Sequence, residues 1–168
     1  MNVTSLHDWY VSELKDIYDA EQQILQALPK MASAASSSDL KGAFQKHLEQ
    51  TRGHVDRLDR IFGGLDETAS GKRCKGMEGI ISEGEKVLQA AGDANAKDAA
   101  LIAAAQKVEH YEIATYGTVR TYANELGYDD AADLLQDTLD EEAATNEKLT
   151  KLAEGGLLSK GINVAAER

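Results

Sequence analysis

Apolar residues recur with the period of an α-helix almost everywhere in this chain, and this regularity limits the fold more than any other feature. Over residues 6–35 they fall three and four positions apart, which places them on one face of a helix. Three further stripes of the same kind follow, over residues 39–62, 96–126 and 129–154. No segment alternates apolar and polar residues between turn signals as a strand would. The pattern therefore predicts an all-α protein.

The lengths of the connections determine how these helices pair. Only a few residues separate the first helix from the second and the third from the fourth, so each pair must form an antiparallel hairpin. About thirty residues join the second helix to the third, and residues 77–91 within that crossover carry a shorter amphipathic stripe. We predict a single domain over residues 1–168. It is a four-helix bundle whose long crossover between helices 2 and 3 carries a short fifth helix, and about residues 157–168 form a loose tail.

The charge balance excludes several classes of partner. Asp and Glu number 29 against 18 Lys and Arg, which gives a net charge of −11 at pH 7. Nucleic acid and anionic membranes are repelled by such a chain, whereas cations are attracted. No run approaches the length of a membrane span, and the N-terminus lacks the regions of a signal peptide. We expect a cytoplasmic protein that binds neither nucleic acid nor membranes.

The chain has one cysteine, Cys74. A single cysteine excludes a disulfide framework and fits a reducing compartment. Because Cys74 lies in a polar segment among Lys72, Arg73 and Lys75, we expect an exposed thiol whose pKa these cations lower.

The two predicted hairpins resemble each other when one is shifted by 91 residues onto the other. The shift aligns apolar positions without a gap, for example Ile17 with Val108. It also aligns Glu21 with Glu112, so the resemblance extends to polar positions on the stripes.

Several glutamates lie on the apolar stripes, where a helix is expected to be buried. Glu21 occupies the centre of the first stripe, and Glu142 occupies the centre of the fourth. On the third helix Glu109 and Glu112 are three residues apart, which places both on or near the inward face. Four carboxylates from three helices therefore point toward one axis.

Histidines of the second helix complete this polar cluster. His47 and His54 occupy the same edge of the stripe, and we favour His54 over His47 and over His110 as a ligand. Taken singly, each of these side chains is more often a residue at a helix edge or a satisfied core histidine. Together, four carboxylates cannot stay ionised in an apolar core unless cations neutralise them or their pKa values rise. Carboxylates with imidazole suit iron or manganese better than zinc, so the cluster predicts two such ions.

Glu49 needs a separate hypothesis, because a regular helix turns it away from the stripe. Gly53 lies in the interior of the same helix, where glycine is unfavourable. A π-bulge there would align Glu49 with His54. With this hypothesis, the predicted metal ligands are Glu21, Glu49, His54, Glu109, Glu112 and Glu142.

Four segments of the sequence also resemble a known family. They are DIYDAEQQILQALPKM, HLEQTRGHVDRL, DAALIAAAQKVEHYEIATYGT and LLQDTLDEEAATNEKLTKLAE, and they resemble the YciF/YciE family of bacterial stress-associated proteins. The resemblance covers nearly the whole chain. It implies a ferritin-like bundle related to rubrerythrins, usually a homodimer, in a family with no established biochemical activity.

The resemblance to the ferritin-like superfamily also implies a ligand pattern. Glu21 and Glu112 match the carboxylates of the first and third helices, and Glu109 with Glu112 matches the Glu-x-x-Glu of rubrerythrins. The Glu-x-x-His pattern of the other two helices is incomplete. Thr145 stands where a histidine would follow Glu142, and Thr51 stands where a carboxylate would precede His54.

Two hypotheses about function follow from the sequence. In the first, the chain is a ferritin-like stress protein that binds a dinuclear non-haem iron or manganese centre and handles O2 or peroxide. In the second, it is a non-catalytic helical dimer with a vestigial metal site that acts through a protein partner. A large iron-storage cage is disfavoured by the resemblance to dimeric proteins. No catalytic residue can be assigned, so the sequence leaves open whether the chain is an enzyme.

Overall fold

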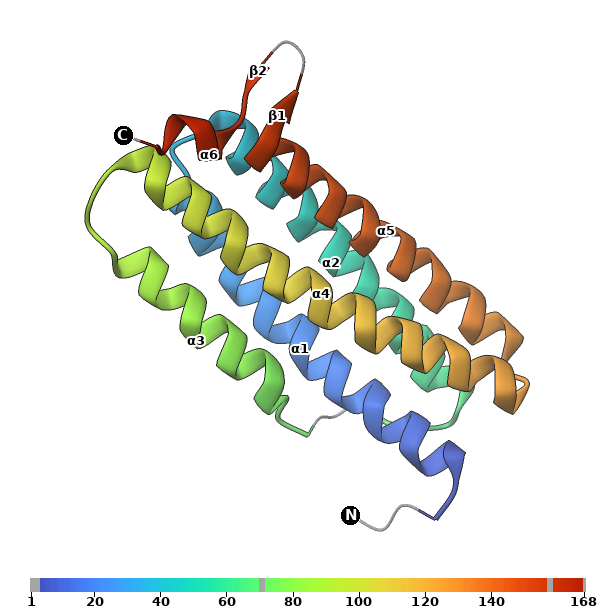
Figure 1. The fold of residues 1–168 in the computed structure, drawn as a ribbon. Helices are drawn as coiled ribbons and strands as arrows, with labels where there is room; N and C mark the ends of the chain where they lie inside the picture. Colours follow the sequence, from blue (N-terminus) through green and yellow to red (C-terminus); the bar gives the residue numbers. More distant parts are fainter. Residues whose placement is uncertain (1–3, 70–71, 157–158, 168) are drawn as a thin grey trace.

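Four long helices and one shorter helix account for most of the chain in the computed structural model, which describes residues 4–69, 72–156 and 159–167 (Figure 1). The elements in chain order are α1 (Leu6–Ala34), α2 (Ser38–Gly64), α3 (Lys75–Gln89), α4 (Ala94–Leu126), α5 (Asp129–Glu154), β1 (Gly155–Gly156), β2 (Ser159–Lys160) and α6 (Ile162–Ala165). The predicted all-α helical bundle is confirmed. None of the helices in the described residues is both long and apolar enough to cross a membrane.

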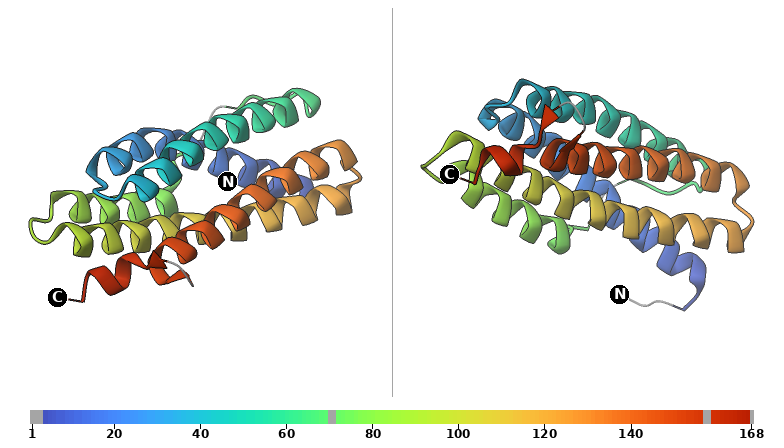
Figure 2. Two further views of the ribbon diagram at one scale, coloured as in Figure 1. Left: turned by 90° about the horizontal axis from the view of Figure 1, so that it is seen from above. Right: turned by 45° about the horizontal axis from the view of Figure 1, so that its top comes forward.

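The bundle consists of two antiparallel hairpins, α1 with α2 and α4 with α5. In the assembled bundle α1 lies against α4 and α2 lies against α5, and the views in Figure 2 show the hairpins stacked on each other. The crossover places α3 outside the four long helices, along α1 and α4. Helix α3 is therefore a wall on one side of the core.

Each long helix begins or ends where its sequence signals a boundary. The Ser5 side chain accepts a hydrogen bond from the Asp8 amide, and the Asp8 carboxylate accepts one from the Ser5 amide. Helix α1 therefore starts in a capping box. Helix α4 starts at Ala94, two residues before the predicted stripe over 96–126, and the Asp93 side chain caps it. It ends at Gly127, whose φ of 74° is the left-handed conformation that favours glycine.

A buried aspartate fixes the turn between α1 and α2. Asp98 of α4 is 2% exposed, and its carboxylate accepts hydrogen bonds from the amides of Ser36 (2.9 Å) and Ser37 (2.7 Å). These two amides belong to the connection between the helices, so one side chain ties the two hairpins together. Asp98 was not among the residues predicted from the sequence.

The environment of Cys74 differs from the prediction of an exposed thiol. Cys74 is fully buried and caps α3, and its Sγ lies 3.0 Å from the Tyr111 hydroxyl, which donates to Asp16. Burial raises the pKa of the thiol instead of lowering it. The nearby cations pair with carboxylates, Lys72 with Asp16 and Arg73 with Glu78.

The C-terminal segment is also more ordered than the expected loose tail, although residues 157, 158 and 168 lie outside the described residues. Gly155 pairs with Lys160 in a short antiparallel ladder, and Ile162 of α6 packs against the core. A Cβ atom on Gly161 would lie 2.3 Å from the Ala153 carbonyl oxygen, so this approach of two backbone segments requires glycine.

We expect Asp98→Ala to lower the free energy of unfolding by about 1–3 kcal/mol, because it leaves two buried amides without an acceptor. Asp98→Asn should lose less, since it keeps one oxygen. Urea unfolding of both variants measures the effect, with the exposed Asp133→Ala as the matched control. Equal stability of Asp98→Ala and Asp133→Ala would show that the turn does not depend on this carboxylate.

Candidate metal centre

Six ionisable side chains meet at the centre of the bundle, although they come from four helices. None of them is more than 2% exposed. They are Glu21 of α1, His47 and His54 of α2, Glu109 and Glu112 of α4, and Glu142 of α5. Because each lies in the middle part of its helix, apolar layers above and below separate the cluster from solvent.

The possible ligand atoms form two groups that share one residue, Glu112. The first group is His47, Glu109, Glu112 and Glu142, and the second is Glu21, His54 and Glu112. Within each group the ligand atoms lie within 4.8 Å of one another. A carboxylate has two oxygens, so Glu112 is placed where it could bridge two cations.

The imidazoles face the carboxylates directly. His54 Nδ1 lies 3.0 Å from Glu142 Oε1 and 3.4 Å from Glu21 Oε1. His47 Nε2 lies 3.3 Å from Glu109 Oε1 and 3.8 Å from Glu142 Oε2. Each histidine therefore belongs to a different half of the cluster, and Glu142 contacts both.

Most of the carboxylate oxygens in the cluster have no hydrogen-bond donor. Among the described residues, both oxygens of Glu112 and both of Glu142 lack a hydrogen-bond partner, as does one oxygen each of Glu21 and Glu109. A buried polar atom without a partner costs free energy, and for an ionised carboxylate the cost is large. Oxygen and nitrogen donors at these spacings fit divalent cations, which would satisfy the unpaired atoms.

The pKa values of the glutamates and histidines in the cluster reflect their burial. Burial, with repulsion from Glu142, raises the pKa values of Glu109 and Glu112 far above the ordinary range, and burial raises that of Glu142 to about 7. Burial also lowers the pKa of His47 to about 3. For His54 burial acts in the same direction, but Glu21 and the other carboxylates outweigh it and raise the pKa to about 8.

A charged pair outside the cluster contacts the His54 ring at Nε2, the nitrogen that faces away from the cluster. Its Nε2 lies 2.9 Å from Glu141 Oε2, and Arg57 donates two hydrogen bonds to the same carboxylate, at 2.9 and 3.0 Å. Arg57 lowers the pKa of Glu141, so this carboxylate is ionised and accepts a hydrogen bond from the His54 Nε2–H. That hydrogen bond directs Nδ1 toward Glu21 and Glu142, in the manner of a metal-binding histidine oriented by a carboxylate. On the same side of the cluster, the Tyr116 ring packs against that of His54 and its hydroxyl donates to Glu21.

The structure brings together five of the six residues that the sequence predicted as ligands: Glu21, His54, Glu109, Glu112 and Glu142. The structure leaves Glu49 outside the cluster, and the predicted π-bulge is wrong. Helix α2 is a regular α-helix throughout, without a π-bulge at Gly53, and the Glu49 side chain is 68% exposed and paired with Arg52. His47 takes the place that Glu49 was expected to fill. The signal that favours it was in the sequence, because His47 and His54 are seven residues apart and therefore share a helical face.

The fold and the cluster together define a class, an all-α bundle whose core holds carboxylates and histidines at spacings that could hold a metal ion. Comparison with known proteins gives the family. Residues 5–162 match the family described as a domain of unknown function (DUF892), and the chain belongs to this family. The resemblance to the YciF family is confirmed by the relatives that follow.

Protein YciF of Escherichia coli (strain K12) is 45% identical over 166 residues, which cover 98% of this chain and all of that protein. The crystal structure of that E. coli stress protein superposes with a TM-score of 0.89, at 43% identity, over 99% of this chain and all of that chain. YcfI of Rhodopseudomonas palustris gives a TM-score of 0.88 at 43% identity, over 90% of this chain and 97% of that chain. A Xanthomonas campestris protein at 22% identity shares the fold, with a TM-score of 0.68 over 88% of this chain and 89% of its own.

We expect the metal-free protein to lose stability as the pH rises from about 5 to 8. In that window the folded state keeps protons on buried glutamates that the unfolded chain has released, so the free energy of unfolding falls by up to about 1.4 kcal/mol per pH unit for each such carboxyl. Glu112→Gln removes one of these groups and should reduce the slope. Chelator-treated protein unfolded by urea at several pH values measures it.

The exposed Glu125→Gln on the same helix is the control, and its slope should match that of the wild type. Parallel curves for Glu112→Gln and Glu125→Gln would contradict a raised pKa at Glu112.

Proposed function

We propose that this chain binds two divalent metal ions, iron or else manganese, in the core of a ferritin-like bundle. The proposal depends above all on the position of Glu112. Its side chain is fully buried, neither of its oxygens has a hydrogen-bond partner among the described residues, and it is common to both groups of ligand atoms. A carboxylate in this position is costly for a metal-free core and suitable as a bridge between two cations.

The composition of the cluster supports the same proposal. Carboxylate-bridged dinuclear sites in helical bundles combine four carboxylates with two histidines, and the cluster contains that set once His47 is included. The arrangement differs, because both histidines come from α2. Thr51 and Thr145, which interrupt the usual pattern, donate their hydroxyls to the backbone carbonyls of His47 and Glu141. Both hydroxyls therefore have an acceptor without a partner from the cluster.

The donor set also bears on which metal is bound. Oxygen ligands outnumber nitrogen ligands, and the residues of the cluster include no thiolate. Zinc in proteins favours fewer ligands and more nitrogen or sulfur, whereas ferrous and manganous ions accept mixed sites rich in carboxylates.

The chemistry we propose is the reduction of O2 or peroxide in protection against stress, as the description of E. coli YciF as a stress protein suggests. Two ferrous ions held by these glutamates and histidines would supply the two electrons that, with two protons, convert one hydrogen peroxide to two waters. Within the protein, the glutamates act as ligands, not as acids or bases. Glu141 and Arg57 orient His54, and the apolar layers limit access of water.

Metal content per chain tests the proposal and separates His47 from Glu49. Protein produced with iron and manganese present should contain about two ions per chain by mass spectrometry, the number a carboxylate-bridged bundle site holds. His47→Ala should lower that content, and the double variant Glu21→Ala/Glu142→Ala should abolish it. Glu49→Gln should leave it unchanged. Folded wild-type protein without bound metal would refute the proposal.

A second candidate function is a non-catalytic helical protein that acts through a partner. Two observations favour it: the interrupted ligand pattern at Thr51 and Thr145, and the provisional description of the relative YcfI as a structural protein. Leu6 and Trp9 at the start of α1 are 40% and 38% exposed, and a second copy of the chain could cover them in a homodimer. Metal-free, fully folded protein that forms a dimer in solution would support this second function.

A further inference from the structure

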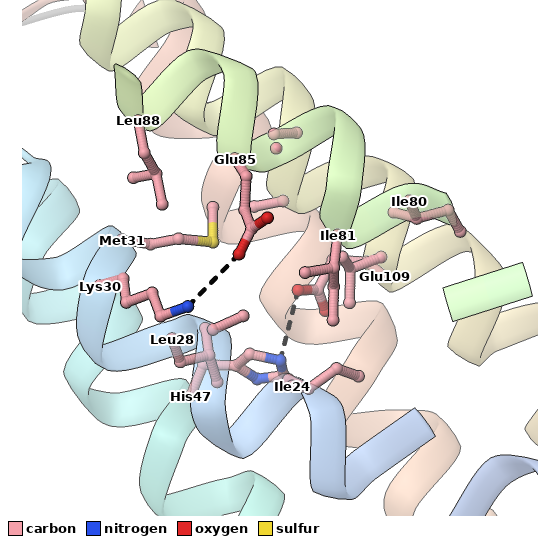
Figure 3. A pocket seen from close by; sticks show the side chains of 15 residues that line it. Ile24, Leu28, Lys30, Met31, His47, Ile80, Ile81, Glu85, Leu88 and Glu109 are labelled. Carbon is pink, nitrogen blue, oxygen red and sulfur yellow. Dashed lines mark hydrogen bonds and ion pairs between the residues drawn. The ribbon is translucent and has the colours of Figure 1, made fainter. Parts of the chain in front are cut away.

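An apolar pocket lies between α1, α3 and α4, next to the His47 side of the candidate metal centre (Figure 3). Its free volume is about 40 Å³. Aliphatic and thioether side chains form most of its wall, among them Ile24, Leu28, Met31, Ile81, Leu88 and Val108. Helix α3 supplies one side of the pocket, so the pocket exists because the crossover lies against the bundle.

The two ends of the pocket differ. At one end Lys30 and Glu85 form an ion pair of 3.3 Å, and their side chains are 58% and 48% exposed, which identifies the solvent side. At the other end lie the buried residues His47 and Glu109. Figure 3 shows both pairs, with the apolar side chains around them.

The inner end carries polar atoms that the protein leaves unpaired. Neither ring nitrogen of His47, nor Glu109 Oε2, has a hydrogen-bond partner among the described residues. Both residues belong to the same group of ligand atoms as Glu112. A molecule at the inner end of the pocket would therefore lie directly beside the candidate metal ligands.

The size and lining of the pocket select its ligand. An apolar cavity of about 150 Å³ accommodates benzene, so this smaller pocket admits a molecule of only a few atoms. Between its two polar ends the wall offers no side-chain hydrogen-bonding group among its lining residues. Along this wall hydrogen peroxide or an anion would lose hydrogen bonds to water and could regain them only at the inner end, whereas a small apolar molecule loses none.

We propose that this pocket binds one molecule of dioxygen and holds it against the His47 and Glu109 side of the metal centre. The inference that dioxygen binds here depends only on the pocket. Its use in metal chemistry rests on the function proposed above. The Lys30–Glu85 pair covers its outer end. Among the two oxidants considered for this protein, the pocket favours dioxygen over peroxide.

Dioxygen is paramagnetic, so NMR relaxation of methyl groups in metal-free protein under oxygen pressure tests the binding directly. We expect a several-fold larger relaxation enhancement at the methyls of Ile24, a buried residue of the pocket wall, than at the equally buried methyls of Val119 on α4. Hydrogen peroxide, added under nitrogen, should leave the chemical shifts of the same methyls unchanged. Enhancement no greater than at Val119 would overturn the proposal, as would a shift of these methyls with peroxide.

Variants that fill the pocket provide the matched test. Ala105→Val adds two methyl groups to the pocket wall, and Ala103→Val makes the same change on the exposed face of α4. The enhancement should be lost in Ala105→Val and retained in Ala103→Val, and its persistence in a folded Ala105→Val would count against the pocket. If Ala105→Val does not fold, Ile81→Phe fills the pocket from the half-buried face of α3. These measurements need no bound metal, so their outcome is separate from that of the metal analysis.

Discussion

The burial of four glutamates in one layer of the core is the constraint on which the rest of this structure depends. Carboxylates that lack donors repel one another and are poorly solvated, so they need either protons or cations. Each helix contributes to this layer at a fixed position, and the contacts of His54 with Glu21 and Glu142 join three of the helices. The contacts that neutralise the charge of these glutamates therefore also fix how the helices align with one another.

The two sides of the cluster are supported differently. On the His54 side, Glu141 and Arg57 orient the imidazole, and Tyr116 donates to Glu21, so the side chains there are held by hydrogen bonds. On the His47 side neither ring nitrogen has a partner in the described part of the chain, and an apolar pocket borders it. In the function proposed above, one side would position the ligands and the other would give access to them. This asymmetry is also a property of the fold, because α3 closes only the His47 side.

Residue spacing was sufficient to locate most of the candidate site, and the three departures from the sequence predictions have physical causes. Glu49 was included because Gly53 was taken to permit a π-bulge, but α2 remains a regular helix and leaves Glu49 beside Arg52 in solvent. His47 was ranked below His54 because the edge of an apolar stripe is ambiguous without knowledge of the neighbouring helix. Cys74 was expected to be exposed, since a loop sequence does not reveal that the loop folds inward onto Tyr111.

The sequence by itself determined the helices, their pairing into hairpins, the long crossover and the presence of glutamates on inward faces. These features follow from local rules: helical periodicity, capping residues and connection length. Only the tertiary structure decided which histidine meets which carboxylate, how Glu141 and Arg57 support His54, how Asp98 ties the hairpins together, and where α3 encloses a pocket. Those contacts join residues far apart in the chain, and they depend on helix rotation and crossover path, which the spacing of residues along one helix cannot specify.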